Sequence, residues 1–338
     1  PDLGNAPSRF SALGRRFRDS RVAASVAAHI PPFQDKPEHV ITRRALSRAF
    51  ARRFSEFEPE LVDIANEVVS TAPRSGDLFS SISSPFSVAV MQRFIGLHAM
   101  DHMAIKRASA AFFHLFAPLN DASVLSDVNA TLAEYREAVL PLVRARRDAP
   151  ASDLISYLVE FKDGDSGLDN LQIADLTLLI LADGIENIEA SVATAMVLTA
   201  QGAGEAIHGG AAAAAIEEVL RLETPGQIIP RVARIDTEVA GVSCKADMPV
   251  LFALGSANRD ERVFPSPDLF DATRGHDDVL TFGRGKHSCI GAPLARAMLI
   301  ALTTALVRAG AQVSPSSELT YAHRFGHRWP NAVKFQIR

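Results

Sequence analysis

The chain has 338 residues, of which 47% are hydrophobic, enough apolar material for one large core or two smaller ones. Its formal net charge of −4 argues against a general nucleic-acid binder, and no uninterrupted apolar run reaches the roughly 20 residues that a membrane span needs. Two cysteines cannot build a disulfide framework, which favours a cytoplasmic protein. Because the chain shows no secretory signal and no initiator Met, we expect a trimmed or processed N-terminus.

Most of the first 200 residues carries apolar side chains at three- and four-residue spacing, which predicts helices. The predicted helices cover 39–54, 59–71, 85–95, 102–116, 130–147, 151–161 and 170–200, and another covers 211–222. Segments rich in Pro, Gly and Asp at 72–76, 118–121 and 163–167 separate them. Asp169 is placed to cap the longest helix.

Beyond Pro225 the pattern changes to short strands, which we expect at 228–235, 238–243, 250–254 and 333–337. One more helix follows Cys289 and is expected to end near Arg308. We find no internal repeat and no convincing linker. Many helices followed by a small β region predict an α+β, predominantly helical fold, in a single domain spanning 1–338.

The most informative segment, 282–291, reads Phe-Gly-Arg-Gly-Lys-His-Ser-Cys-Ile-Gly and precedes an apolar helix. Backbone N–H groups and the helix dipole at such a position favour a thiolate at Cys289. Gly283, Gly285 and Gly291 allow a close approach, so a flat macrocycle can lie here with its metal on the sulfur. The alternative for a lone cysteine is an ordinary core residue, and this is our interpretation of Cys244.

The spacing F-x-x-G-x-H-x-C-x-G resembles the haem-ligand loop of the cytochrome P450 superfamily. The resemblance implies a P450 fold, haem b as cofactor and Cys289 as the axial thiolate, with Phe282, Gly283 and Gly291 shaping the loop. Thiolate ligation of haem iron favours O–O cleavage. The resemblance also implies a shortened N-terminal region, since about three dozen residues precede the first predicted helix. We therefore expect an open or unusually shaped substrate pocket.

Glu218 and Arg221 lie three residues apart on one helical face, and a solvated surface pair is the usual meaning of this spacing. The later segment 257–274 resembles the family's segment whose final arginine, here Arg274, joins the E-x-x-R pair. The resemblance implies a structural triad of Glu218, Arg221 and Arg274 that braces the thiolate loop.

Haem carries two propionates that need cationic partners. His39 and Arg43 lie four residues apart, and the sequence around them resembles the family's P-E-H-x-x-x-R-R helix, which supplies such a pair. By the same resemblance Arg231 and His287 complete the clamp, for which arginine suits because its planar fork matches a carboxylate. A solvent-facing histidine at a helix start is the alternative for His39 alone.

The long predicted helix is apolar nearly all round, yet polar side chains interrupt it near its middle. The stretch Gly184 to Asn187 resembles the family's G-x-[DE]-T segment, where the helix opens over haem and binds dioxygen, with Asn in place of Thr. The resemblance assigns catalytic roles to Gly184, Glu186 and Asn187. An amide is a poor proton relay, and Glu186 can feed protons through water. A helix-face carboxylate without a catalytic role is the alternative for Glu186.

Three consequences of Asn187 stay open. Water takes over the relay and ordinary hydroxylation survives, or the substrate brings its own hydroxyl, or the enzyme performs oxidative coupling or peroxide-driven chemistry. By position in the family, the substrate pocket is expected at Ile180, Asp183, Gly184, Ile228 and Ile229, with 325–329 as a further wall.

Arg44, Arg48 and Arg52 recur every four residues and form a basic stripe on a mildly acidic protein. A solvated helix face is one interpretation. In the family this helix lies near the side where acidic iron–sulfur or flavin carriers dock, which favours a ferredoxin or flavodoxin-type electron donor.

The leading hypothesis is a soluble, cytoplasmic haem-thiolate monooxygenase of secondary metabolism. It inserts one oxygen atom from O2 into a small or medium organic substrate, either free or bound to a carrier protein, and it engages neither nucleic acid nor membrane. The second hypothesis is an atypical member that performs phenol or C–C coupling or uses peroxide. The third is a catalytically silent haem-binding or docking protein.

Overall fold

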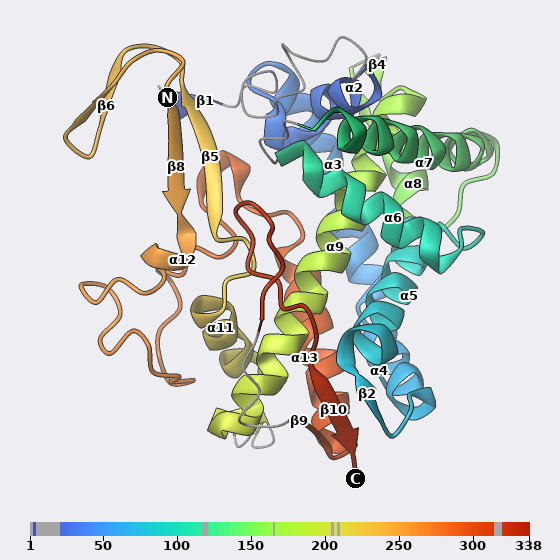
Figure 1. Ribbon diagram of the computed structural model, residues 1–338. Coiled ribbons are helices and arrows are strands. Elements are labelled where there is room, and N and C mark those ends of the chain that lie inside the picture. Colours follow the sequence, from blue (N-terminus) through green and yellow to red (C-terminus); the bar gives the residue numbers. More distant parts are fainter. Residues whose placement is uncertain are drawn as a thin grey trace. The chain divides into compact units, whose positions relative to one another are not determined.

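The computed structural model describes residues 3–4, 21–116, 121–164, 166–203, 206–207, 210–313 and 320–338 (Figure 1). Two compact units make up the chain. The first consists of Pro1–Arg53, Arg93–Ala182 and Ile228–Phe252, and the second of Phe54–Gln92, Asp183–Gln227 and Ala253–Arg338. Each unit has its own set of helices and a small β region. No described helix is long and apolar enough to cross a membrane.

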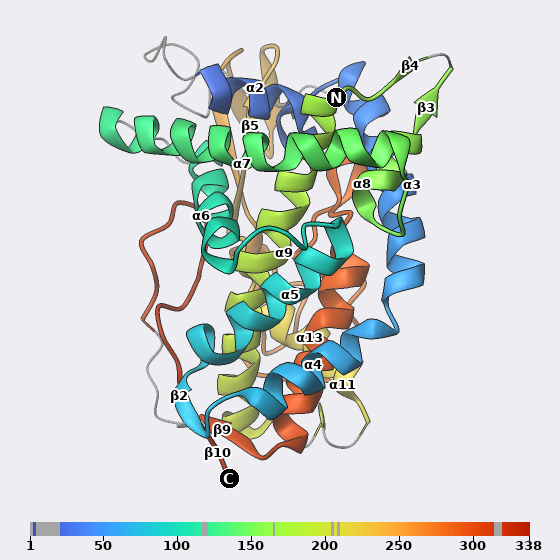
Figure 2. The same ribbon diagram turned by 90° about the vertical axis from the view of Figure 1, so that its right-hand side faces the viewer.

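The helices of the first unit are α2 (Arg21–His29), most of α3 (Glu38–Phe57), α6 (His102–Phe113), α7 (Ala122–Asp148), α8 (Leu154–Glu160) and the first half of α9 (Asn170–Leu198). Helix α7 packs against α2, α6 and α8 (Figure 2). Asp101, Asp121 and Asp153 each accept backbone N–H groups at the start of α6, α7 and α8, which satisfies donors that have no partner within a helix.

A buried ion cluster fastens three helices of this unit together. Asp175 of α9 is fully buried and accepts from Arg136 of α7 through two hydrogen bonds of 2.8 and 2.6 Å. His29 at the end of α2 lies 2.6 Å from the same carboxylate. Because the charge of Asp175 is compensated by hydrogen bonds on both oxygens, it is tolerated in the core.

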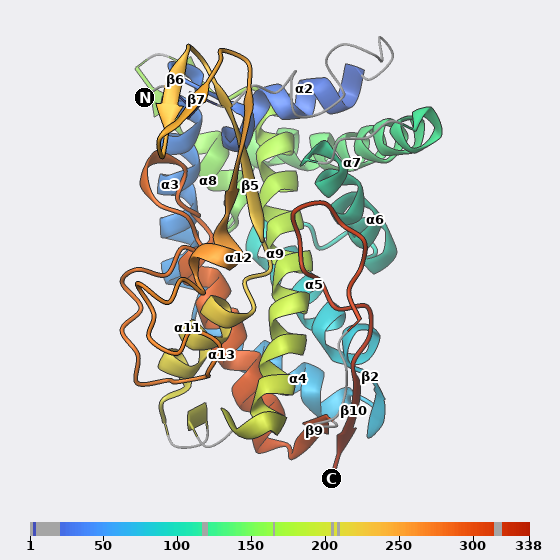
Figure 3. The ribbon, with the colours of Figure 1, turned by 60° about the vertical axis from the view of Figure 1, so that its left-hand side comes forward.

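The second unit contains α4 (Glu60–Thr71), most of α5 (Ser84–Ile95), the second half of α9, α11 (Ala212–Leu222), α12 (Leu254–Ala257) and α13 (Ala292–Arg308). Helix α13 packs against α4 and α11 (Figure 3), and its buried residues include Leu294, Met298 and Leu302. A small antiparallel sheet has the order β2 (Ser75–Asp77), β10 (Lys334–Ile337) and β9 (Ala311–Val313), with Phe335 opposite both Gly76 and Val313.

In the first unit, β5 (Ile228–Ala233) pairs with β1 (Leu3–Gly4) and β8 (Pro249–Ala253). The prediction of one strand over 238–243 is wrong, because β6 (Thr237–Val239) and β7 (Val242–Cys244) form an antiparallel hairpin. Ala240 and Gly241 both have positive φ, 50° and 80°, as a tight two-residue hairpin turn requires. An alanine in this conformation is uncommon, which is why the turn escapes a reading of the sequence.

The predicted helices are confirmed to within a few residues, with one larger difference. Helix α7 begins at Ala122 rather than at residue 130, because Asp121 caps it there. The cap predicted for α9 is confirmed, since Asp169 Oδ1 accepts from Gln172 N at 2.8 Å and Gln172 Oε1 accepts from Asp169 N at 3.0 Å. Helix α2 and strand β2 were not predicted, and 118–120 of one predicted breaker lie outside the described residues.

Candidate functional site

The loop around Cys289 closes on itself through backbone hydrogen bonds. Cys289 N donates to Phe282 O at 2.8 Å, and Ser288 N donates to Gly285 O at 3.0 Å. Gly283 and Gly285 have φ values of 65° and 76°, a region that only glycine enters without strain. The loop therefore needs glycine at these two places, and it leaves Cys289 exposed.

The thiol lies three residues before α13, whose first turn contains Pro293 and whose N-cap residue is Gly291. The first N–H groups of a helix have no partner within it and carry partial positive charge. A Cβ at Gly291 would lie 3.7 Å from the Cys289 sulfur, so glycine keeps this flank of the sulfur open. The arrangement favours a thiolate that can act as a ligand.

Arg296 of α13 packs against the ring of Phe282, the first residue of the loop. The guanidinium of Arg296 lies 4.5 Å from the centre of the Phe282 ring. Arg296 also forms an ion pair with Glu217 of α11, with Nη2 3.1 Å from Oε2. The loop is therefore fastened to two helices of the second unit.

The structure brings Glu218, Arg221 and Arg274 into direct contact. Arg221 Nε and Nη2 both donate to Glu218 at 2.7 Å, and neither side chain has any exposed surface. Arg274 Nε donates to Glu218 Oε1 at 3.1 Å. Arg221 Nη1 also donates to the carbonyls of Asn258 and Pro267, at 2.8 and 2.7 Å. The ion pair thus fixes the course of the chain that leads toward the thiolate loop.

Three residues that the sequence analysis assigned no role connect this ion cluster to the loop. Asn258 is fully buried, and its Nδ2 donates to Thr224 Oγ1 at 2.7 Å and to Thr281 Oγ1 at 2.9 Å. Its Oδ1 accepts from Leu280 N at 2.7 Å. Thr281 directly precedes Phe282, so the network ends at the thiolate loop. The signal available in the sequence was Asn258 itself, inside the segment that resembles the family.

Helix α9 is α-helical from Asn170 to Leu198, although the resemblance implies an opening at Gly184. A Cβ at Gly184 would lie 2.3 Å from Sδ of Met91, a buried residue of α5. Glycine at this position is therefore explained by the close packing of Met91 against the helix.

Asn187 forms a hydrogen bond that could not be foreseen from its own segment. Its Oδ1 accepts from Nε1 of Trp329 at 3.1 Å, and Trp329 is 5% exposed. Trp329 belongs to the segment 320–333, which thus reaches α9 through this side chain. The expected pocket wall 325–329 and the expected catalytic residue Asn187 therefore meet within the second unit.

His327 and Arg324 surround Trp329. The imidazole of His327 lies 4.5 Å from the Trp329 ring, and its Nδ1 donates to Phe325 O at 2.9 Å. Burial lowers the pKa of His327, while the hydrogen bond to Phe325 raises it, Arg324 lowers it and the Glu186 carboxylate raises it. The net result is a pKa of His327 below the usual value of a histidine, and the Glu186 carboxylate acts on it electrostatically.

Asp183 lies one turn before Asn187 in α9. Its side chain keeps accessible surface, yet the surrounding protein desolvates the carboxyl and raises its pKa to about 7. Asp183 is thus a carboxyl group that changes charge near neutral pH, which the sequence pattern did not reveal.

The other expected site residues belong to the first unit. His39 is 4% exposed and lies one helical turn before Arg43 at the start of α3. Arg231 lies in β5, where burial lowers its pKa against the opposing effect of the Asp35 carboxylate. Ile180 is buried in α9, and Ile228 and Ile229 are half-buried in β5. His287 belongs to the second unit, so the clamp of four cations stays a prediction.

Two arginines of the basic stripe are engaged within the first unit. Arg44 pairs with Asp163 at 2.6 Å, and Arg52 pairs with Glu160 at 2.8 Å. The Arg52 guanidinium also lies 3.8 Å from the centre of the Tyr157 ring. Arg48 is exposed and forms no ion pair with any described residue. The stripe is therefore a mixed surface of both charge signs rather than a purely basic one.

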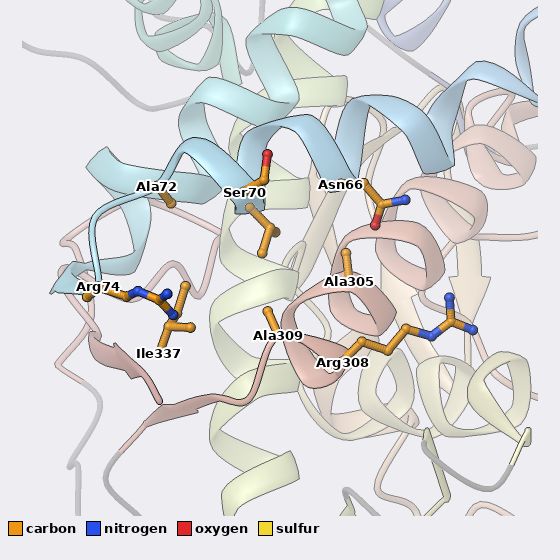
Figure 4. A pocket seen from close by; sticks show the side chains of 9 residues that line it. Asn66, Ser70, Ala72, Arg74, Ala305, Arg308, Ala309 and Ile337 are labelled. Carbon is orange, nitrogen blue, oxygen red and sulfur yellow. The ribbon is translucent and has the colours of Figure 1, made fainter.

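A surface groove of about 470 Å³ lies beside the C-terminal end of α13 (Figure 4). It is lined by Asn66, Val69, Ser70, Ala72, Arg74, Ala305, Arg308, Ala309 and Ile337. Helix α13 has 17 residues and so spans about 25 Å between this end and the end that follows Cys289. The groove is therefore separate from the thiolate loop.

Comparisons with known proteins agree with this geometry. The family model described as Cytochrome P450 matches residues 212–314, which include α11, the Glu218 cluster and the Cys289 loop. The chain is 33% identical over 312 residues to Nocardicin C N-oxygenase of Nocardia uniformis subsp. tsuyamanensis, covering 89% of this chain and 77% of the relative. It is also 33% identical over 286 residues to Mycinamicin IV hydroxylase/epoxidase of Micromonospora griseorubida, covering 81% and 70%.

Among solved structures, the chain resembles P450BioI in complex with an acyl carrier protein ligated to hexadec-9Z-enoic acid. The TM-score is 0.90 at 23% identity, and the match covers 100% of this chain and 87% of the other. At this identity the likeness shows the shared fold.

Proposed function

We propose that Cys289 is the axial iron ligand of this chain, which belongs to the cytochrome P450 superfamily and is a haem b-dependent monooxygenase. The loop around Cys289 predicts this membership. The observation that carries this proposal is the exposed sulfur in a glycine-dependent loop directly before the N-terminus of α13. When bound, haem with a thiolate ligand supplies activation of dioxygen with two delivered electrons.

The residues present fit this cofactor. The loop presents one exposed sulfur, that of Cys289. A single sulfur suits a metal that a macrocycle already holds at its other positions. The open flank beside Gly291 gives a flat molecule access to the sulfur.

We further propose that His39, Arg43, Arg231 and His287 bind the haem propionates. Arg231 supports this, because it is half-buried in β5 and burial lowers its pKa although the Asp35 carboxylate raises it. A haem carboxylate would accept charge-assisted hydrogen bonds from the Arg231 guanidinium. Phe282 and Gly283 are proposed to shape the loop. Glu218, Arg221 and Arg274 are proposed to act as its structural brace. Asn258 links this brace to Thr281, the residue before the loop.

The α9 residues are proposed to serve the reaction as follows. Gly184 lets α5 pack closely against α9, and Asn187 supplies N–H donors at the position that matches the threonine of the family's G-x-[DE]-T segment. Glu186 and Asp183 are the carboxyl groups available to pass protons to water, and the raised pKa of Asp183 allows it to release and regain a proton near neutrality. Asp183, Ile180, Ile228 and Ile229 are proposed to contact the substrate.

The substrate is proposed to be a small or medium organic molecule of secondary metabolism, taken up free or on a carrier protein. The relatives named as an N-oxygenase and a hydroxylase/epoxidase support the first alternative, and the carrier complex of P450BioI supports the second. A ferredoxin or flavodoxin-type donor is proposed to deliver electrons in the cytoplasm, docking near Arg44, Arg48 and Arg52. Oxidative coupling or peroxide use is the second candidate, favoured by Asn187.

The test is the absorption spectrum of the reduced protein under carbon monoxide, with Cys289→Ser compared with Cys244→Ser. Wild type and Cys244→Ser are expected to show the far-red-shifted Soret band of a thiolate complex, and Cys289→Ser is expected to bind haem without this shift. Cys244 is a matched control because it is buried in β7 and distant in sequence from the loop. A far-red band that survives Cys289→Ser would overturn the assignment.

A further inference from the structure

Trp329 holds its indole in a fixed place beside Asn187. Trp329 O accepts from Ala322 N at 2.8 Å, and Tyr321 forms a β-bridge with Pro330. These two contacts hold the backbone of Trp329 and Pro330 against the segment 321–322. The ring is buried and packs against His327. Its Nε1 donates to Asn187 Oδ1 at 3.1 Å.

This contact decides which end of the Asn187 amide is available. An indole nitrogen can only donate a hydrogen bond, so the amide oxygen has to face it and the NH2 group has to point away. Asn187 is half-buried, and its Nδ2 has no hydrogen-bond partner among the described residues. Two N–H donors are therefore left for a bound molecule.

We propose that Trp329 is a positioning residue that locks the Asn187 amide so that Nδ2, and not Oδ1, is presented to ligands bound over the haem. The inference rests on the proposed function, since it takes residue 187 to lie at the threonine position of the family's G-x-[DE]-T segment. A threonine hydroxyl both donates and accepts, whereas this locked amide only donates. The site therefore favours ligands that carry a hydrogen-bond acceptor, such as a carbonyl or ether oxygen.

The lock itself is tested without turnover, because Trp329 is the one tryptophan of the chain. Labelling with ¹⁵N-tryptophan gives one indole N–H signal in the diamagnetic ferrous carbonyl form of the haem-loaded protein. Asn187→Leu, which removes the acceptor, is expected to move this proton signal upfield. Asn187→Asp, which keeps an acceptor, is expected to leave it at or downfield of the wild-type position. An unchanged signal in Asn187→Leu would show that the lock does not exist.

The presented group is tested by the infrared C–O stretch of the same carbonyl complex. Asn187→Leu is expected to shift the band to higher wavenumber, because a donor near the ligand is lost. Trp329→Phe is expected to broaden or split the band, because the amide can then present either end. In the Asn187→Leu background, Trp329→Phe is expected to cause no further change.

Tyr321→Phe is the matched control, since it removes a 2.9 Å hydrogen bond with Arg328 in the same segment without touching Asn187. Its band should match wild type. If Trp329→Phe shifts the band equally with and without Asn187, then Trp329 acts through packing and the inference fails. Failure of the proposed function would instead appear as loss of the thiolate-type Soret band in the wild-type protein.

Discussion

Asn258 donates a hydrogen bond to Thr281 at 2.9 Å, and this contact joins the segment braced by the buried Arg221–Glu218 pair to the loop that carries Cys289. We predict that Asn258→Ala leaves the N–H of Leu280 without its acceptor and removes one of the hydrogen bonds of the Thr281 hydroxyl, which still donates to Leu220 O at 2.7 Å. Each unsatisfied group costs about 1–3 kcal/mol. Haem dissociation, measured by transfer to a haem-scavenging globin, should accelerate.

The matched control is Asn331→Ala, because Asn331 is exposed and its side chain makes one long hydrogen bond to Thr320. Equal haem release from the two variants would show that Asn258 does not stabilise the loop.

The fully buried pair of Arg221 and Glu218 predicts a large and asymmetric mutational effect. Arg221→Met removes the two shortest hydrogen bonds of the buried Glu218 carboxylate, which keeps Arg274 as a partner, and should lower the free energy of unfolding by about 3–5 kcal/mol. The double variant Glu218→Leu with Arg221→Met should recover part of this loss, since it removes both charges. Urea unfolding followed by circular dichroism measures both effects.

Arg262→Ala serves as a control, because Arg262 pairs with Asp260 on the surface and its removal should leave the urea midpoint unchanged. A double variant that is less stable than Arg221→Met would contradict this account of the buried pair.

The desolvated carboxyl of Asp183 predicts a pH-dependent stability. Its pKa is about 7 in the folded protein and lower in the unfolded chain, so the folded state holds the proton more tightly. Stability should therefore fall as pH rises from about 4 to 7 and then level off. Asp183→Asn removes this penalty, and its Tm should exceed that of wild type by more at pH 8 than at pH 5. An equal difference at both pH values would contradict the raised pKa.

The ion pairs of Arg44 with Asp163 and of Arg52 with Glu160 predict how electron delivery responds to charge changes. The double variant Asp163→Asn with Glu160→Gln removes the two acids that pair with Arg44 and Arg52 and should speed reduction by an acidic ferredoxin, measured by stopped flow at low ionic strength. Arg48→Glu should slow it, and high salt should abolish both differences. Reduction rates that do not change in either variant would show that the electron donor does not dock at these arginines.

The local features of this site could be predicted from the sequence, because the residues that indicate each of them lie within a few positions of one another. The glycines around Cys289 and the three-residue spacing of Glu218 and Arg221 each follow from one turn or one helix. The long helix α9 and its cap at Asp169 were likewise predicted from periodicity and a single side chain.

What the sequence could not supply are contacts between distant segments. Trp329 and Asn187 are 142 residues apart, and neither segment alone indicates that the indole fixes the amide. The resemblance predicts an opening of the helix at Gly184, whereas in the structure the helix continues there and Met91 of another helix packs closely against Gly184. The acids that neutralise Arg44 and Arg52 come from segments more than 100 residues away, so the helix pattern showed a uniformly basic stripe.

The most direct test of the thiolate assignment is iron K-edge X-ray absorption of the haem-loaded protein. The account predicts one sulfur scatterer in the first coordination shell of iron, present in wild type and Cys244→Ser and lost in Cys289→Ser. A wild-type spectrum with only nitrogen or oxygen neighbours around iron would contradict it.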